Sequence, residues 1–227
     1  MIVVHHLEAS RSQRVLWALE ELGLEYEVKK YQRDPTTSLA PKELRDVHPL
    51  GKSPVVTDDG RTFAESGAIL EYLARKYGNG RLVPKEGTLE HDRYLYWLHY
   101  AEGSAMPPLL LKLIVGRMQS GRNVPFLARP LVRAVGNKMA DTFVDKNLRN
   151  HLDWIESELG KSAWFAGEEL TMADIQMSFP VEAGATRAGG PEGSAKRPRM
   201  AAFVERMRER PAYKRAIEKG GPFEIMS

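Results

Sequence analysis

The chain of 227 residues contains no cysteine. Disulfide bonds, cysteine-ligated metal sites, C-x-x-C redox pairs and a catalytic cysteine are therefore excluded. The six histidines show no H-E-x-x-H spacing, and His5 and His6 occupy adjacent strand positions, whose side chains point to opposite faces. We therefore expect no metal site.

Long apolar runs are also missing. No segment approaches the roughly 18 apolar residues of a membrane span, and Met1–Val4 is too short for a signal-peptide core and has no basic flank. These absences favour a cytoplasmic location and no membrane partner. The net charge of +3 is spread along the chain, with no basic run interleaved with aromatic residues, so we expect no nucleic-acid partner.

The length and composition suit a soluble globular protein with one large domain or two small ones. The best linker in the sequence is the stretch G-N-G-R-L-V-P-K-E-G, which starts at Gly78 and ends at Gly87. We expect a first domain at 1–79, a linker at 80–87 and a second domain at 88–227.

The first domain alternates strand and helix patterns. The expected elements are a strand at Ile2–His6, a helix from Ser10 that stops at Gly23, a strand at Tyr26–Tyr31, a short helix from Pro41, a hairpin over Val55–Ala64 and a helix from Ser66 to Tyr77. A strand–helix–strand start implies a parallel pair joined by a right-handed crossover.

The second domain shows helical patterns and no convincing strand. The expected helices cover Thr88–Met118, Leu131–Leu159, Thr171–Ala183, Met200–Arg210 and Ala212–Lys219, with a loop over 184–198. Pro107 and Pro108 predict a kink or break in the first of these helices.

The stretch from His48 to Ser66 combines a turn, a hairpin and a helix start. Pro54 stands where a strand should begin, so its missing N–H belongs to a turn, an edge or a cis peptide bond. Ser66 stands at a helix N-terminus, where free N–H groups can hold an anion. One end of the stretch can therefore hydrogen-bond an extended peptide, and the other can hold a carboxylate.

This arrangement, P-x-G-K-x-P followed by E-S, resembles the thioredoxin-like domain of the glutathione transferase family. The stretch that begins R-P-R-M-A-A-F-V-E-R at Arg197 looks like that family's C-terminal helices. The resemblance therefore covers nearly the whole chain. It implies an α/β thioredoxin-like N-terminal domain followed by an all-α helical C-terminal domain, with glutathione as co-substrate and no other cofactor.

The resemblance also implies roles for five residues. Ser53-Pro54 becomes a cis peptide whose Ser53 backbone pairs with the cysteinyl main chain of glutathione, and Lys52 reaches the glycine carboxylate. Ser66 takes the α-carboxylate of the γ-glutamyl end, while Glu65 takes its ammonium group or orients the site. Taken without the resemblance, the alternatives are a trans proline at a strand start for Pro54, a surface lysine for Lys52 and an ordinary helix N-cap for Ser66.

Glutathione must also lose its thiol proton, because the thiolate is the nucleophile. Many relatives carry S-P-x-S-R-x-V after the first strand, whereas this chain has Ala9 at the usual serine position and no tyrosine near the end of that strand. Its S-R-x-x-R stretch is closer to a bacterial and fungal branch. We assign the thiol donor to Ser10, with Ser12 or a backbone N–H as alternatives. Ser10 and Gln13 can instead form an S-x-x-Q capping box for the first helix.

A second capping box has a purely structural interpretation. Thr171 and Asp174 have the required spacing, with Leu170 and Ile175 as a hydrophobic staple around them. The family carries a similar box in its second domain. We assign this motif to folding, not to chemistry.

The main interpretation is a cytosolic glutathione transferase that adds the thiolate to a small apolar electrophile, as a homodimer with a role in detoxification. The electrophile pocket is expected beside the Ser10 loop, with Tyr100, Met106 and Leu110 as candidates. Ala9 keeps open a non-catalytic binding or scaffold module, and glutathione-dependent peroxide reduction is a further alternative.

Overall fold

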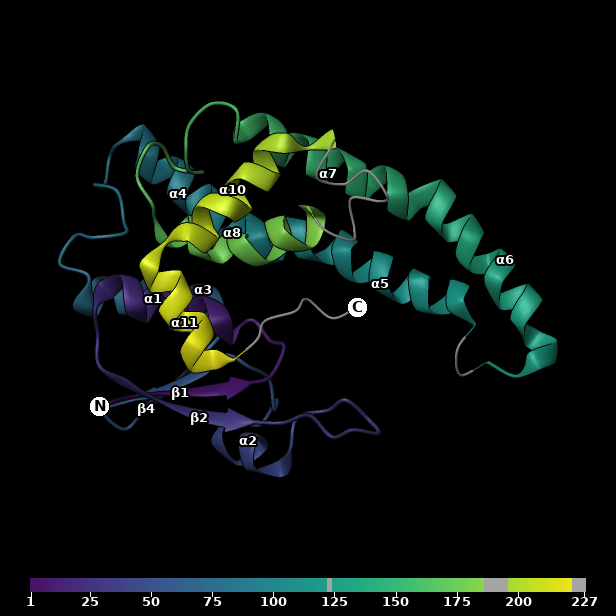
Figure 1. Ribbon diagram of the computed structural model, residues 1–227, viewed down its shortest axis with the longest axis horizontal. Helices are drawn as coiled ribbons and strands as arrows, with labels where there is room; N and C mark the ends of the chain where they lie inside the picture. The colour runs from purple at the N-terminus through teal and green to yellow at the C-terminus, as the bar shows by residue number, and fades with distance from the viewer. Residues whose placement is uncertain (122–123, 186–195, 222–227) are drawn as a thin grey trace.

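The computed structural model describes residues 1–121, 124–185 and 196–221. Its N-terminal part contains a four-stranded sheet with the order β2-β1-β3-β4 (Figure 1). The strands are β1 (Ile2–Leu7), β2 (Tyr26–Tyr31), β3 (Val55–Asp58) and β4 (Arg61–Ala64). β1 runs parallel to β2, and β3 is antiparallel to both β1 and β4. The predicted parallel pair and hairpin are therefore confirmed.

Three helices complete this part. α1 (Ser12–Leu22) connects the parallel strands and packs with α3 (Ser66–Tyr77) over one face of the sheet, while α2 (Lys42–Val47) lies on the other side (Figure 1). Gly23 ends α1 in the left-handed conformation with φ 66°, as its place after the last apolar residue predicts.

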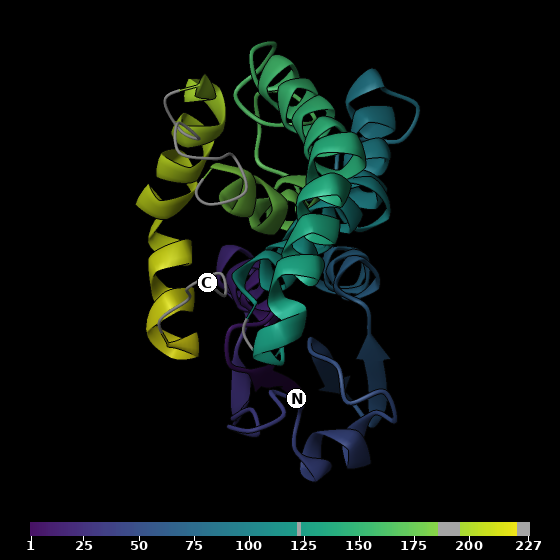
Figure 2. The same ribbon diagram turned by 90° about the vertical axis from the view of Figure 1, so that its right-hand side faces the viewer.

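In the rest of the described chain the regular elements are helices. Its α-helices are α4 (Leu89–Tyr100), α5 (Met106–Ser120), α6 (Arg129–Met139), α7 (Asp145–Glu158), α8 (Met172–Ala183), α10 (Pro198–Glu209) and α11 (Pro211–Gly220). Figure 2 shows these helices stacked on the α1 side of the sheet. No described helix is both long enough and apolar enough to cross a membrane. The expected class, a thioredoxin-like domain followed by a helical one, is confirmed.

Two predictions about the long helices need correction. The interruption of the α-helix comes before Pro107 and Pro108, which lie in the first turn of α5, and no break follows them. A π-helical turn at Ala101–Ala105 joins this helix to α4. The helix predicted over Leu131–Leu159 is α6 and α7, joined by a second π-helical turn at Ala140–Val144.

The hydrophobic core runs continuously from α1 and α3 into the helical part. α8 is buried along most of its length and contacts α4, α1 and α3. α11 returns across the molecule and packs beside α1 (Figure 1). The domain boundary at residues 80–87 stays a prediction. The described residues before and after it contribute to one hydrophobic core.

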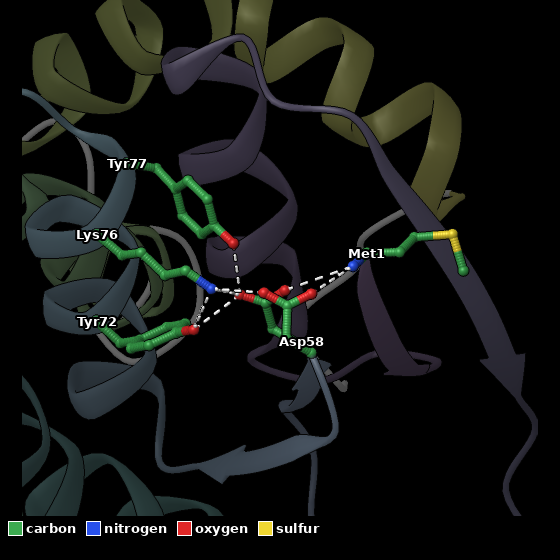
Figure 3. A network of polar contacts seen from close by, with 6 residues as sticks. Met1, Asp58, Tyr72, Lys76 and Tyr77 are labelled. Atoms are coloured by element: carbon green, nitrogen blue, oxygen red, sulfur yellow. Dashed lines mark hydrogen bonds and ion pairs between the residues drawn. The ribbon is translucent and has the colours of Figure 1, made fainter.

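A buried carboxylate, Asp58, fixes the end of the α3 helix that lies opposite to Ser66 (Figure 3). Its Oδ2 accepts hydrogen bonds from the Tyr72 hydroxyl at 2.7 Å, the Tyr77 hydroxyl at 2.6 Å and Lys76 Nζ at 2.8 Å. Burial alone would raise the pKa of Asp58, but the hydrogen bonds from Lys76, Tyr77 and Tyr72 lower it to about 2. This cluster ties α3 to β3.

Candidate functional site

Three loops meet at one edge of the sheet because β1 ends there, β3 begins there and β4 ends there. The loop after β1 carries Ser10, the loop before β3 carries Ser53, and Glu65 precedes the first residue of α3. The stretch from His48 to Ser66 and the serine-rich loop after β1 therefore lie side by side. We call this edge the serine edge.

The loop before β3 is held by the Ser53 side chain. The Ser53-Pro54 peptide bond is cis, as the resemblance implies. The Ser53 hydroxyl donates to the His5 carbonyl at 3.0 Å and accepts the Leu7 N–H at 3.3 Å, so it joins this loop to the end of β1. Pro54 is buried beneath it.

The two candidate thiol donors are in contact. Ser10 Oγ lies 2.7 Å from Ser12 Oγ, accepts the Ser12 N–H at 3.3 Å and donates to Ser53 Oγ at 3.2 Å. Ser12 Oγ is 2.9 Å from His6 Nδ1. Ser12 is fully buried, whereas Ser10 keeps 7% of its surface exposed. Of the two, Ser10 therefore lies closer to a ligand that arrives from solvent.

The predicted Ser10–Gln13 capping box is wrong. α1 begins at Ser12, with Arg11 at the N-cap and no side-chain cap hydrogen bond. The Gln13 N–H contacts the Ser10 carbonyl at 3.5 Å, not the hydroxyl, and the Gln13 side-chain amide has no hydrogen-bond partner in the described residues. The reason is that Ser12 and Ser53 use the hydrogen-bonding capacity of the Ser10 hydroxyl. Ala9 before it adopts φ 46°, which is uncommon for a residue with a Cβ.

Ser66 occupies the first turn of α3 and is buried. Its Oγ accepts hydrogen bonds from Arg14 Nη1 at 3.1 Å and from Gln176 Nε2 at 3.0 Å. A hydroxyl has two lone pairs and one proton, so these two donors fill its accepting capacity and its proton remains for another acceptor. Next to it lie the N–H groups of the first turn of α3, which have no intrahelical acceptors. The Ser66 hydroxyl proton and these free N–H groups together suit a carboxylate.

Arg14 adds positive charge beneath Ser66. It is fully buried, and its Nη1 lies 2.5 Å from Glu102 Oε1, which also accepts from Arg11 Nε at 3.0 Å. Burial lowers the pKa of Arg14 to about 10, against the opposing effect of the Glu102 charge, so the guanidinium is cationic at neutral pH. Glu102 belongs to the π-helical turn between α4 and α5, and therefore joins the helical part to this site.

Lys52 and Glu65 border the same edge. Both side chains are exposed, and within the described ranges neither makes a hydrogen bond or ion pair. Glu65 has φ 70°, so the chain turns sharply before α3 begins. Both charges are therefore available to a ligand.

The three candidate pocket residues do not share one environment. The Tyr100 hydroxyl binds His151 Nδ1 at 2.6 Å, so this side chain faces α7 and not the serine edge. Met106 is buried, whereas Leu110 is 53% exposed. Met106 and Leu110 follow Glu102 by four and eight residues, which places them near the same side of the helix as the Arg14 contact.

Sequence reasoning missed Arg14, Glu102 and Gln176. Gln13 and Arg14 are polar residues directly before the apolar run from Val15 to Leu19, and this pattern could have drawn attention to Arg14. Glu102 and Gln176 carry no local signal. They lie 88 and 110 residues from the partners that they contact, and only the fold brings them together.

Comparisons with known proteins agree with this architecture. The family model for the glutathione S-transferase N-terminal domain matches residues 1–75, and that for the C-terminal domain matches residues 126–211. "Glutathione S-transferase 3" of Schizosaccharomyces pombe is 41% identical over 80% of this chain and 73% of its own length.

Solved structures agree too. A glutathione S-transferase from Actinobacillus pleuropneumoniae has a TM-score of 0.78 and 32% identity, and the match covers 97% of this chain and 93% of the other. A glutathione transferase family member from Pseudomonas fluorescens, with two glutathione bound, has a TM-score of 0.72 and 28% identity over 96% and 92% of the two chains. The chain is an enzyme of the glutathione S-transferase family.

Proposed function

We propose that the serine edge binds glutathione in an extended form and that Ser10 stabilises its thiolate for addition to a small apolar electrophile. The observation that carries this proposal is the Ser66 hydroxyl, whose lone pairs are both filled by Arg14 and Gln176. Its proton is left to donate, beside the free N–H groups of α3, to the α-carboxylate of the γ-glutamyl end.

The other ligand contacts follow from position along the edge. The Ser53 backbone, next to the cis bond, pairs with the cysteinyl main chain. Lys52 reaches the glycine carboxylate, and Glu65 takes the ammonium group. The family member from Pseudomonas fluorescens that has two glutathione bound supports this choice of ligand.

Ser10 supplies the hydroxyl donor to the sulfur. A free thiol has a pKa near 8.5, and each unit of depression requires about 1.4 kcal/mol of selective stabilisation of the anion. Charge-assisted hydrogen bonds are about twice as strong as neutral ones, so one hydroxyl and the nearby backbone donors can supply one or two units. Ser12 is the weaker alternative, because its hydroxyl is fully buried between Ser10 and His6.

The remaining parts of the proposal rest on family resemblance. Met106 and Leu110 line the electrophile pocket, with Tyr100 farther from it. The enzyme acts as a cytoplasmic homodimer in detoxification and belongs to the bacterial and fungal S-R-x-x-R branch.

The test separates binding from chemistry. Wild type and Ser10→Ala are compared for retention on glutathione resin and for conjugation rate with an activated aryl halide. We expect both proteins to be retained and conjugation by Ser10→Ala to fall about tenfold or more, because one charge-assisted hydrogen bond is lost. Retention of wild type without any turnover would support a binding module instead. Unchanged turnover in Ser10→Ala would move the thiol donor to Ser12 or to a backbone N–H.

A further inference from the structure

Four polar groups form an unbroken row of hydrogen bonds from the core to the serine edge. The row runs from His6 Nδ1 to Ser12 Oγ (2.9 Å), to Ser10 Oγ (2.7 Å) and to Ser53 Oγ (3.2 Å). It ends at the His5 carbonyl, 3.0 Å from Ser53 Oγ. His6 is 6% exposed, and the two serines beside it separate it from Ser53. Nothing in the proposed ligand contacts uses this histidine.

The direction of every bond in the row follows from its last member. A carbonyl only accepts, so the single proton of the Ser53 hydroxyl points to His5. Ser53 is therefore an acceptor for Ser10, as it is for the Leu7 N–H. The proton of Ser10 lies toward Ser53, and the proton between Ser12 and Ser10 belongs to Ser12.

The same reasoning fixes His6. Since Ser12 donates its proton to Ser10, it accepts at its contact with His6, and His6 Nδ1 carries a proton. The opposite tautomer would take the Ser12 proton and turn the Ser10 proton toward Ser12. Ser10 and Ser53 would then face each other at 3.2 Å with no proton between them. The row therefore keeps all of its hydrogen bonds only when Nδ1 carries a proton.

We propose that His6 is a positioning residue for thiol activation: through Ser12, it holds the Ser10 hydroxyl as a hydrogen-bond donor toward the glutathione sulfur. This inference rests on the proposed function. The Ser12 hydroxyl and the Ser12 N–H both donate to Ser10 Oγ, so its lone pairs are filled and only its proton remains to be directed. When the thiolate arrives, that proton turns from Ser53 to the sulfur, because a charged acceptor binds it more strongly than a neutral hydroxyl.

The surroundings of His6 fit a structural donor more than a general base. Burial and the Lys30 charge lower the pKa of His6, while a hydrogen bond with the Gly220 backbone raises it. The net effect is a lowered pKa of His6, so the ring is a weak acceptor for the thiol proton. The protonated ring donates from both nitrogens, to Ser12 and to the Gly220 backbone, whereas the neutral ring has one N–H, which the row places on Nδ1.

The test measures the pKa of the bound thiol, which a merely structural role would not move. Full-length wild type, His6→Leu and Ser12→Ala are saturated with glutathione, and thiolate absorbance in the ultraviolet is followed against pH. Glutathione affinity is measured by calorimetry at a pH below the thiol pKa. We expect the thiol pKa to rise by about one unit in both variants, with about three- to eightfold less thiolate at neutral pH. The affinity should stay within about twofold.

Two further variants separate the loss of the His6 Nδ1–H donor from a general disturbance of the structure. His6→Asn places an amide N–H close to the position of Nδ1 and should recover part of the lost pKa depression. Tyr31→Phe removes the hydroxyl that lies 2.8 Å from the neighbouring His5 ring on the other face of β1, and should leave the thiol pKa unchanged. Should His6→Leu fail to fold, Ser12→Ala decides the question alone.

The outcomes distinguish the two proposals. Failure of wild type to bind glutathione would overturn the proposed function. Tight binding by all variants, with the same thiol pKa in wild type, His6→Leu and Ser12→Ala, would overturn the role of His6 and leave glutathione binding in place. An equal loss in His6→Asn and His6→Leu would also contradict the donor role.

Discussion

Arg14 in α1 donates a hydrogen bond of 3.1 Å to the hydroxyl of Ser66 at the start of α3. The same guanidinium nitrogen contacts Glu102 from the helical part. The first helix of the chain therefore aligns a hydroxyl in α3 and is itself held by a carboxylate beyond the predicted linker. This relationship makes the anion-binding end of the site depend on both parts of the molecule.

Arg14→Lys should weaken glutathione binding by about tenfold. Lysine keeps the charge, but its side chain is shorter, so its ammonium group does not reach the position from which Arg14 Nη1 contacts both Ser66 and Glu102. One charge-assisted hydrogen bond is then lost, which is worth about 1.5 kcal/mol. Calorimetric titration with glutathione measures the effect. Arg11→Lys is the matched control, because Arg11 shares Glu102 but no contact between Arg11 and Ser66 is present in the described residues. Equal affinities of both variants would contradict the role of Arg14.

Asp174→Ala should lower the free energy of unfolding by about 3 kcal/mol. The predicted capping box is confirmed, and Asp174 Oδ2 accepts from the N–H and the hydroxyl of Thr171, each at 2.8 Å. Its Oδ1 also accepts the Phe165 N–H at 2.7 Å, so the substitution leaves several buried donors without partners. A thermal melt should show a fall of about 5–10 °C. A melt identical to that of wild type would refute the assignment to folding.

Asp58→Asn should remove a pH-dependent part of the stability. The folded pKa of about 2 lies below the ordinary value of 3.8, so ionised Asp58 stabilises the protein above pH 3.8, and this stabilisation is lost as the pH falls toward 2. The shift corresponds to about 2 kcal/mol. Urea unfolding at neutral pH should show this loss in Asp58→Asn, and the difference from wild type should shrink between pH 4 and pH 2.

The control for that experiment is Asp46→Asn. Asp46 makes an exposed ion pair with Lys42 at a spacing of four residues. Such pairs contribute little to stability, because solvent screens the two charges. A pH dependence of the same size in both variants would contradict the special role of the buried Asp58 cluster.

The sequence predicts the serine edge well where its signals are local. Pro54 at a strand start, the Asp58-Asp59-Gly60 turn and Ser66 at a helix start are short-range patterns, and the structure has β3, the hairpin and α3 where these patterns predict them. The Thr171 capping box is local in the same sense. Each depends on neighbouring backbone groups, so few other contacts can override it.

The failed predictions involve competition with distant partners. Ser10 and Gln13 have the spacing of a capping box, but Ser53 lies 43 residues from Ser10 and takes its hydroxyl instead. The first turn of α3 has a similar dependence, since Gln176 from α8 binds Ser66. A local sequence pattern does not include such a partner, because only the three-dimensional fold brings the two side chains into contact.

The most direct test of the account is calorimetric titration of glutathione into Ser66→Ala. The substitution removes the donor to the α-carboxylate and leaves Arg14 Nη1 and Gln176 Nε2 without their shared acceptor. Ser157→Ala is the control, since Ser157 is an exposed serine in α7 that donates to the Trp154 carbonyl. We predict that wild type and Ser157→Ala bind glutathione alike and that Ser66→Ala loses at least about tenfold in affinity. Wild-type affinity in a folded Ser66→Ala variant would contradict the placement of glutathione at this edge.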